Sequence, residues 1–248
     1  ALNVLFEKLA AMQDTKYSVQ CSYLEIYNEK CRDLLFKPGA GVAAIGSNSS
    51  SKRIDPDDLQ INVSDGVSVP GATIRAVESK LQALKVMEEG FARRQTASTK
   101  MNAQSSRSHG IFTIYITTAI TVNNVCTEST RKLHFVDLAG SESMGKTGAK
   151  GETQKEGANI NTSLSTLSSV IRTLAENEQN KTNNPPPFRQ SKLTKLLQDS
   201  FGCGNPLCLI TNISPSKDNL TESKSSLSFA SSARSLPPAV FKPKAKVT

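Results

Sequence analysis

The sequence has no tryptophan, only two histidines, and five cysteines that show neither C-x-x-C spacing nor a dense framework. It also has no apolar run that approaches the ~18 residues of a membrane span, and no charged-then-apolar leader opens it. These absences favour a soluble, unsecreted chain with reduced thiols and no cysteine-based metal site. The cysteines are Cys21, Cys31, Cys126, Cys203 and Cys208.

Basic residues are in excess: 30 lysines and arginines stand against 22 aspartates and glutamates, for a net charge of +8. This balance predicts attraction to a polyanion, which would be nucleic acid, an anionic membrane or an acidic protein surface. A nucleic-acid binder is disfavoured, because the basic residues lack the interleaved aromatic side chains of a base-stacking surface.

Hydrophobic periodicity predicts strands that alternate with helices, and this order indicates a layered α/β domain. We predict one domain over 1–235 and a Pro/Lys-rich linker or neck-like tail over 236–248. Helices are predicted at the chain start, after a Ser79 cap with Leu81, Leu84 and Phe91 on one face, and over 157–176, 191–201 and 221–234. Strands are predicted over 17–27, near 59–63 and 73–77, and over 111–122, 131–139 and 206–214, and a mobile loop over 38–51.

The predicted strands 111–122 and 131–139 are joined by a polar turn and are expected to form an antiparallel hairpin. The segment that enters the first strand, NAQSSRSH, and the segment that leaves the second, DLAGSE, then lie at the same end. The first offers the hydroxyls of Ser105 and Ser106, and the second offers the carboxylate of Asp137 followed by a glycine.

These groups suit the γ-phosphate of a nucleotide and its Mg²⁺. Arg107 and Glu142 are placed to pair across the two segments. Each segment alone also fits an ordinary turn, a serine-rich one in the first case and one formed by an aspartate in the second. Their facing arrangement is the more specific signal.

Residues 140–147 read GSESMGKT and match the phosphate-binding pattern G-x-x-x-x-G-K-[ST]. A working phosphate loop is followed at once by a helix whose N-terminal amides hold the phosphates. Here Gly148 and Gly151 come next, and helical periodicity begins only near Ala158. We therefore interpret the octapeptide as a flexible loop in which Lys146 and Lys150 reach an acidic partner. The alternative is a genuine phosphate loop.

Several segments stand in the order found in kinesin motor domains: NAQSSRSH, HFVDLAGSE, EGANINTSL, PFRQSKLTKLLQDS and SSLSFASSAR. The chain resembles that family from residue 1 to about residue 235. The resemblance implies a P-loop NTPase-like α/β fold with a mixed central sheet flanked by helices, truncated at its N-terminal side. It further implies a microtubule-based motor, a microtubule-stimulated ATPase of the cytoplasm and cytoskeleton that uses ATP and Mg²⁺.

The resemblance also implies roles for single residues. Switch I of the family corresponds to Asn102, Ser105, Ser106 and Arg107, and switch II corresponds to Asp137, Gly140 and Glu142. Ser106 and, through a water, Asp137 are the implied Mg²⁺ ligands. Gly140 is the implied γ-phosphate sensor, and Arg107 and Glu142 form the implied catalytic salt bridge. Nucleotide binding is assigned to Asn102, Ser105, Ser106, Asp137 and Gly140.

Kinesin motors carry their phosphate loop and first core strands ahead of the helix that resembles ALNVLFEKLAAM, and these residues include nothing of that kind. We expect a fragment of a longer motor, because lost central strands would leave open sheet edges and uncovered apolar faces. The alternative is a pseudo-motor, a non-catalytic microtubule-binding module. ATP and ADP are expected partners of the intact motor, and any dimer would form through regions outside this chain.

A microtubule-binding face is the last expectation. The predicted helix 157–176 carries an apolar stripe of Ile160, Leu164, Leu167, Ile171 and Leu174, with Asn159, Asn161, Ser163 and Ser165 outside it. Arg189, Lys192 and Lys195 follow as a basic edge, which is either an ordinary solvated face or an edge for an acidic partner. The resemblance implies contact with tubulin through Lys146, Lys150, Lys155, Asn159, Asn161, Arg189, Lys192 and Lys195. Such binding should weaken with salt.

Overall fold

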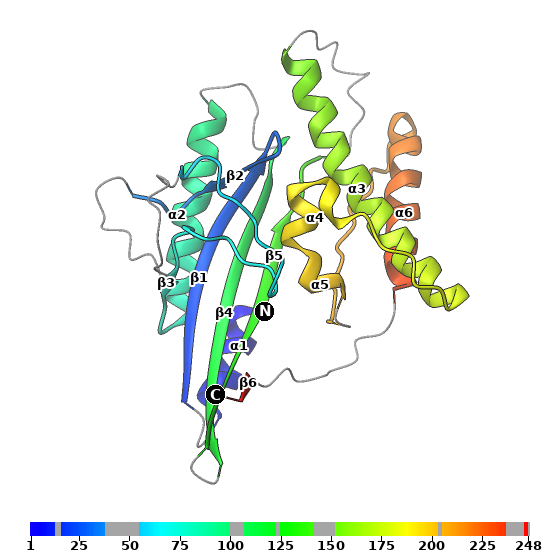
Figure 1. The fold of residues 1–248 in the computed structure, drawn as a ribbon. Coiled ribbons are helices and arrows are strands. Elements are labelled where there is room, and N and C mark those ends of the chain that lie inside the picture. The colour runs from blue at the N-terminus through cyan, green and yellow to red at the C-terminus, as the bar shows by residue number, and fades with distance from the viewer. Residues whose placement is uncertain are drawn as a thin grey trace. The chain divides into compact units, whose positions relative to one another are not determined.

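The computed structural model describes residues 1–12, 16–37, 55–99, 107–122, 125–140, 152–202, 205–236 and 246–247. The chain divides into two compact units, whose elements are labelled in Figure 1. The first unit comprises residues 1–60, 70–138 and 243–248, and the second comprises 61–69 and 139–242. Among the helices described, none is long and apolar enough to cross a membrane.

The first unit is built on a six-stranded sheet with the order β2-β1-β4-β5-β6, and β3 also pairs with β1. The strands are β1 (Lys16–Tyr27), β2 (Lys30–Asp33), β3 (Arg75–Ala76), β4 (His109–Val122), β5 (Val125–Asp137) and β6 (Lys246–Val247). Every pairing between these strands is antiparallel. The layered α/β class predicted from the sequence is confirmed, with the described part of its sheet antiparallel throughout.

The β4–β5 hairpin confirms the predicted pairing but is longer than the sequence indicates. β5 begins at Val125, whereas the apolar pattern predicts a start at residue 131. The polar stretch joins the ladder because Thr117 and Thr130 lie opposite each other, with their hydroxyl oxygens 2.9 Å apart. Cross-strand threonine pairs stabilise a sheet without any apolar signal in the sequence.

The shorter strands differ from the prediction. β2 was not expected; it returns from β1 through Asn28 and Glu29, whose φ angles of 50° and 56° belong to a type I′ hairpin turn. The strand predicted near 59–63 is reduced to an isolated bridge between Asn62 and Ser68, and the one near 73–77 to the two residues of β3. These segments pair over too few residues to extend a ladder.

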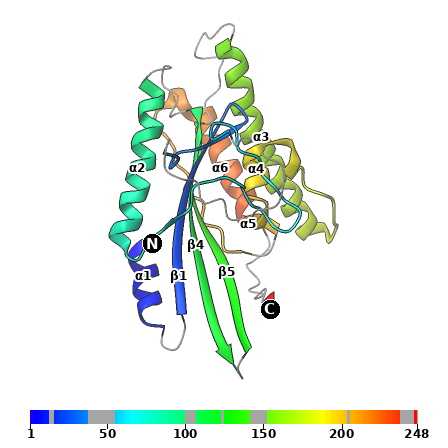
Figure 2. The same ribbon diagram turned by 60° about the vertical axis from the view of Figure 1, so that its left-hand side comes forward.

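Two helices, α1 (Leu2–Ala10) and α2 (Lys80–Thr99), lie along the same face of the sheet (Figure 2). Between them and the strands lies an apolar core that includes Cys21, Tyr23, Phe112 and Ile114. The apolar side of α1 packs against this core as its spacing predicts, with Leu9 buried. Burial of this apolar surface is the main force that holds the helices on the sheet.

The face of α2 that meets the sheet is not the predicted one. Ser79 caps the helix as expected, accepting a hydrogen bond from the amide of Gln82. Leu81 and Phe91 are exposed, however, and the buried positions are Ala83, Val86, Gly90 and Arg94. Ala83 and Gly90 are small, which lets the helix approach the strands closely. A Cβ on Gly90 would lie 2.3 Å from the ring of Tyr23.

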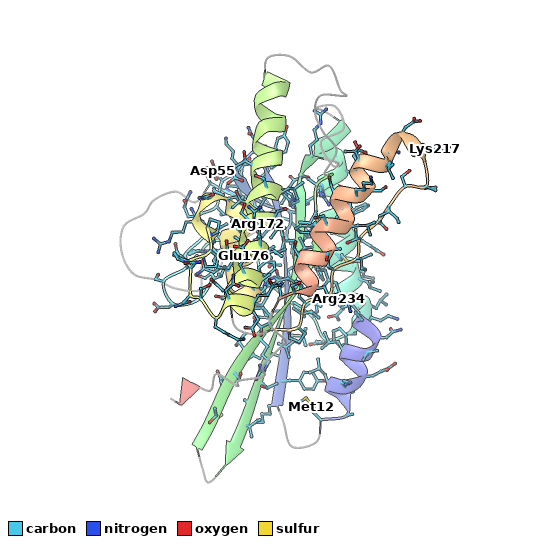
Figure 3. The ribbon with its side chains drawn as sticks, turned by 90° about the vertical axis from the view of Figure 1, so that its right-hand side faces the viewer. Met12, Asp55, Arg172, Glu176, Lys217 and Arg234 are labelled. Carbon is cyan, nitrogen blue, oxygen red and sulfur yellow. The ribbon has the colours of Figure 1, made fainter. Side chains whose placement is uncertain are left out.

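The second unit is helical in its described part. Its elements are α3 (Glu152–Asn180), η3 (Phe188–Gln190), α4 (Lys192–Leu196), α5 (Gln198–Gly202), η4 (Lys217–Asn219) and α6 (Leu220–Arg234). α3 contacts η3, α4 and α6. Arg172 and Glu176 are exposed on α3, and Lys217 and Arg234 mark the two ends of the η4–α6 segment (Figure 3). α6 confirms the helix predicted over 221–234.

α3 is longer and more deeply packed than the sequence predicts. It begins at Glu152 rather than near residue 157, because Glu, Gln and Lys favour helix without adding apolar periodicity. Leu167 and Ile171 are buried and Ser165 is exposed, as predicted. Ser163 is buried, which corrects its predicted outer position. Because α3 has neighbours on more than one side, its buried sector is wider than the apolar stripe.

Two further predictions in this unit are wrong. The helix expected over 191–201 is divided at Leu197 into α4 and α5, with Ser191 capping α4 through the amide of Thr194 at 3.2 Å. The strand expected over 206–214 is absent from the described backbone of 205–215. A strand needs a partner for its backbone hydrogen bonds, and none of the described strands pairs with this segment. Its Ile210 is 82% exposed.

Candidate functional site

The end of the β4–β5 hairpin that lies opposite its turn brings together the end of NAQSSRSH and the start of DLAGSE. Gly110 pairs with Asp137, so the residues that enter β4 and those that leave β5 share one end of the sheet. Ser108 directly precedes β4, and Asp137 is the last residue of β5. The predicted arrangement of the two strands is confirmed at this end.

Arg94 of α2 is the residue that joins the two strand ends. Its side chain is 2% exposed, and its guanidinium donates to oxygen atoms of both strand ends. Nη1 lies 2.7 Å from Oδ2 of Asp137, Nη2 lies 2.7 Å from the carbonyl oxygen of Ser108, and Nε lies 3.1 Å from Oγ of Ser108. The rigid fork of an arginine suits such bridging, because its donors point in fixed directions.

Gly110 makes room for this guanidinium. A Cβ at Gly110 would lie 2.7 Å from Nη1 of Arg94 and 3.3 Å from the hydroxyl oxygen of Tyr23. Any larger residue would therefore displace the arginine from Asp137. The glycine in RSHGIF thus serves the packing of the site rather than a turn.

Glu25 lies behind Arg94 near the C-terminal end of β1 and is 1% exposed. Its carboxylate oxygens lie 3.8 Å from Nε of Arg94 and 3.8 Å from Nη1 of Arg32. Neither oxygen accepts a hydrogen bond from the part of the chain that the structure describes. A buried carboxylate is costly unless cations compensate it, and these two arginines supply that compensation inside the sheet.

The polar cluster also changes the protonation of its neighbour His109. The pKa of His109 is lowered to about 4, chiefly by burial and then by the positive charge of Arg94, while Asp137 acts in the opposite direction. His109 is therefore neutral at physiological pH. Burial likewise raises the pKa of Tyr23, an effect that Arg94 opposes.

Asp137 is the accessible group of the cluster. Its side chain is 71% exposed although Oδ2 is tied to Arg94. A carboxylate of this kind fits Mg²⁺, which takes hard oxygen ligands, keeps several waters and needs only one or two carboxylates beside the phosphates of a nucleotide. No cluster of three or more metal-binding side chains occurs in the described ranges. A metal here would accordingly depend on Asp137 with water, hydroxyl and phosphate ligands.

The remaining predicted nucleotide-site residues are placed only in part. Arg107 is partly buried directly ahead of Ser108, and Gly140 is partly buried in the second unit. Asn102, Ser105, Ser106 and Glu142 lie outside the described residues. The predicted pairing of Arg107 with Glu142 therefore stays a prediction.

The predicted partner-binding residues belong to the second unit. Arg189 is exposed on η3, and Lys192 and Lys195 are partly exposed on α4. Lys155, Asn159 and Asn161 lie on α3, with side chains outside the described set, and Lys146 and Lys150 lie outside the described residues. The role of η3 and α4 as a basic edge for an acidic partner stays a prediction.

The sequence motifs do not point to Arg94 or Glu25, although Arg94 leaves a recognisable signal. It continues the spacing of Ala83, Val86 and Gly90, the positions of α2 that are buried against the sheet. A charged residue in register with a buried helix face predicts a buried ion pair. Glu25 is harder to find, because it stands in a strand where polar and apolar residues alternate.

The model of the family "Kinesin motor domain" matches residues 1–236. The chain belongs to the kinesin motor-domain family. This kinesin chain is 40% identical over 235 residues to chromosome-associated kinesin KIF4 of Gallus gallus and 42% identical over 235 residues to kinesin-like protein klp-20 of Caenorhabditis elegans. It is 40% identical over 237 residues to kinesin-like protein 3 of Schizosaccharomyces pombe.

These alignments cover most of the chain but a minor part of each relative. They include 95%, 94% and 95% of this chain against 18%, 33% and 39% of the relatives, in the same order. The chain therefore spans less than half the length of these curated relatives.

Solved kinesin structures share the fold. A fast kinesin matches with a TM-score of 0.78 at 37% identity, covering 99% of this chain and 63% of that one. A KIF14 dimer in a two-heads-bound state with AMP-PNP, in complex with a microtubule, matches with a TM-score of 0.78 at 31% identity. That comparison covers 98% of this chain and 65% of the other.

Proposed function

We propose that this chain contributes the two switch segments and the microtubule-binding face of an ATP-driven microtubule motor. The observation that carries the proposal is the kinesin motor-domain match over residues 1–236. The hairpin end supports it, because Arg94 ties Ser108 and Asp137 together where the two switch motifs meet the sheet.

In this proposal the chain's own residues bind and orient a nucleotide. Ser106 and, through a water, Asp137 would hold Mg²⁺, which would supply positive charge to neutralise the phosphates. The amide of Gly140 contacts the γ-phosphate, and Asn102 and Ser105 line the nucleotide. Arg107 and Glu142 form a salt bridge as the site closes, which couples the two switch segments.

The proposed partner is the microtubule. Tubulin is acidic, and the basic residues Arg189, Lys192 and Lys195 stand on η3 and α4. The KIF14 structure in complex with a microtubule supports the same partner for this chain. Charge complementarity of this kind speeds association and weakens with salt. We accordingly propose the cytoskeleton as the site of action, and place any dimer contact in regions outside this chain.

A non-catalytic microtubule-binding module is the second candidate. One observation favours it: the only match to the phosphate-loop pattern in this chain is GSESMGKT over 140–147. α3 begins at Glu152, after Gly148 and Gly151, so the helix does not follow Lys146 and Thr147 at once. That spacing does not suit a phosphate cradle, which uses the amides of an adjoining helix N-terminus.

Calorimetry with Mg-ATP and microtubule co-sedimentation test the proposal. We expect the isolated chain to bind microtubules in a salt-sensitive way but to bind Mg-ATP weakly, because the switches contact chiefly the γ-phosphate and metal. The full-length protein should bind Mg-ATP and hydrolyse it. Micromolar binding with turnover by the isolated chain would assign the cradle to GSESMGKT instead. Full-length protein that binds microtubules without hydrolysing ATP would favour the non-catalytic module.

A further inference from the structure

We propose that Arg94 is a positioning residue of the nucleotide site, which holds the carboxylate of Asp137 against the start of β4 and is itself held from behind by Glu25. The inference rests on the proposed function and extends it to two residues outside both switch motifs. Arg94 comes from α2 and Glu25 from β1, so neither belongs to the NAQSSRSH or DLAGSE segment.

The geometry around Arg94 leaves its guanidinium little freedom. Ser108 accepts hydrogen bonds through both its hydroxyl and its carbonyl oxygen, and Glu25 attracts Nε from inside the sheet. Gly110 and Tyr23 close the space beside Nη1. The guanidinium is held on several sides, so its Nη1 points to Asp137 in one direction.

The direction of Nη1 sets the orientation in which the Asp137 carboxylate is presented to a ligand. Asp137 is exposed and stands at the end of a strand, where an untied carboxylate would sample several rotamers. The bond from Arg94 to Oδ2 fixes the carboxylate plane. Oδ1 would then be the oxygen that faces a ligand. Outer-shell partners of this type orient metal-binding carboxylates and raise metal affinity.

Glu25 supplies the compensating charge that allows a buried arginine at this place. Replacing Arg94 alone leaves Glu25 buried with a single cation, Arg32, at 3.8 Å. Such a variant would lose stability for reasons unrelated to Asp137, because an uncompensated buried charge is strongly destabilising. Removing both charges separates the two effects.

The test compares Arg94→Met, the double variant Glu25→Gln/Arg94→Met and Arg93→Met in the full-length protein. Arg93 is a matched control, because it neighbours Arg94 on α2 but its guanidinium donates to the carbonyls of Leu34 and Phe36 and to Glu89. Two quantities are measured for each: the melting temperature, and the Mg²⁺ concentration that half-saturates retention of a fluorescent ADP analogue.

We expect Arg94→Met to lower the melting temperature and the double variant to regain much of it. Both variants should still need at least about ten-fold more Mg²⁺ for half-saturation, because losing an outer-shell partner usually lowers metal affinity by that factor. Arg93→Met should lower the melting temperature without changing the Mg²⁺ requirement. A double variant that recovers the wild-type Mg²⁺ requirement along with its stability would overturn the positioning role and leave Arg94 a structural residue.

Amide hydrogen exchange on the same full-length variants separates this inference from the proposed function. The double variant should exchange faster than wild type at the start of β4 and the end of β5, whereas Arg93→Met should not. If wild-type full-length protein retains no nucleotide, the proposed function fails even when exchange shows that Arg94 ties the strand ends. If nucleotide is retained but exchange is unchanged in the double variant, the positioning inference alone fails.

Discussion

His109 is buried at the start of β4, where Arg94 and Asp137 act on its charge in opposite senses. Burial dominates, so the folded protein binds a proton at His109 only near pH 4, whereas the unfolded chain does so near pH 6.5. The unfolded state therefore takes up the proton first as the pH falls. The contribution of His109 to stability is present above pH 6.5 and is lost as the pH falls toward 4.

A pH series of urea unfolding on the isolated chain tests this electrostatic account. Between pH 7 and pH 5 the wild type should lose about 2 kcal/mol of unfolding free energy through His109. His109→Gln should remove that part of the slope, since glutamine has no proton to gain. The matched variant His134→Gln, at the other histidine, should keep it. Equal slopes in wild type and His109→Gln would show that His109 is not buried in a neutral state.

At the scale of elements, the approach of α2 to β1 depends on a missing side chain. A Cβ at Gly90 would lie 2.3 Å from Cδ1 and 3.0 Å from Cγ of Tyr23, which is too close for any real contact. The helix must shift to accept it, and Tyr23 packs edge to face on Phe112 at 5.6 Å. The small buried positions of α2 thus set the distance at which Arg94 reaches the strand ends.

Gly90→Ala is therefore expected to destabilise the chain by about 1–3 kcal/mol through overpacking. Helix propensity alone would make Gly90→Ala more stable than wild type, because alanine favours a helix interior over glycine by roughly 1 kcal/mol. Thermal and urea unfolding measure the difference. Gln95→Ala, at an exposed position of the same helix, should stay within about 0.5 kcal/mol of wild type. A more stable Gly90→Ala variant would contradict the close packing of α2.

Elements with a strong local signal were predictable, and those that depend on a partner were not. β1 and β4 are rich in β-branched and aromatic residues, and Ser79 caps α2, so their places follow from the sequence. The segment 206–214 has the same composition as a strand, yet it lacks a pairing strand among the described elements. The sequence does not indicate the turn before β2, because Glu29 has a positive φ at a position where glycine is usual.

At the scale of the whole molecule, the order of short motifs predicted the family more reliably than any single pattern. NAQSSRSH and HFVDLAGSE flank one hairpin, and the register of Gly110 with Asp137 confirms that their strand ends meet. The residues that tie them, Arg94 and Glu25, come from distant parts of the chain and have no motif of their own. Their roles follow from burial and charge, which a linear sequence does not display.

Steady-state ATPase measurement on the full-length protein, with and without microtubules, tests the central claim most directly. Wild type should be stimulated by microtubules, and Gly140→Ala and Glu142→Ala should each lose most of the stimulated rate while retaining some microtubule binding. The methyl group of alanine would keep the backbone of residue 140 from the γ-phosphate, and loss of Glu142 would leave Arg107 without its proposed switch partner. Wild-type turnover in both variants, or no stimulation of the wild type, would contradict the assignment of these segments as the switches of a kinesin motor.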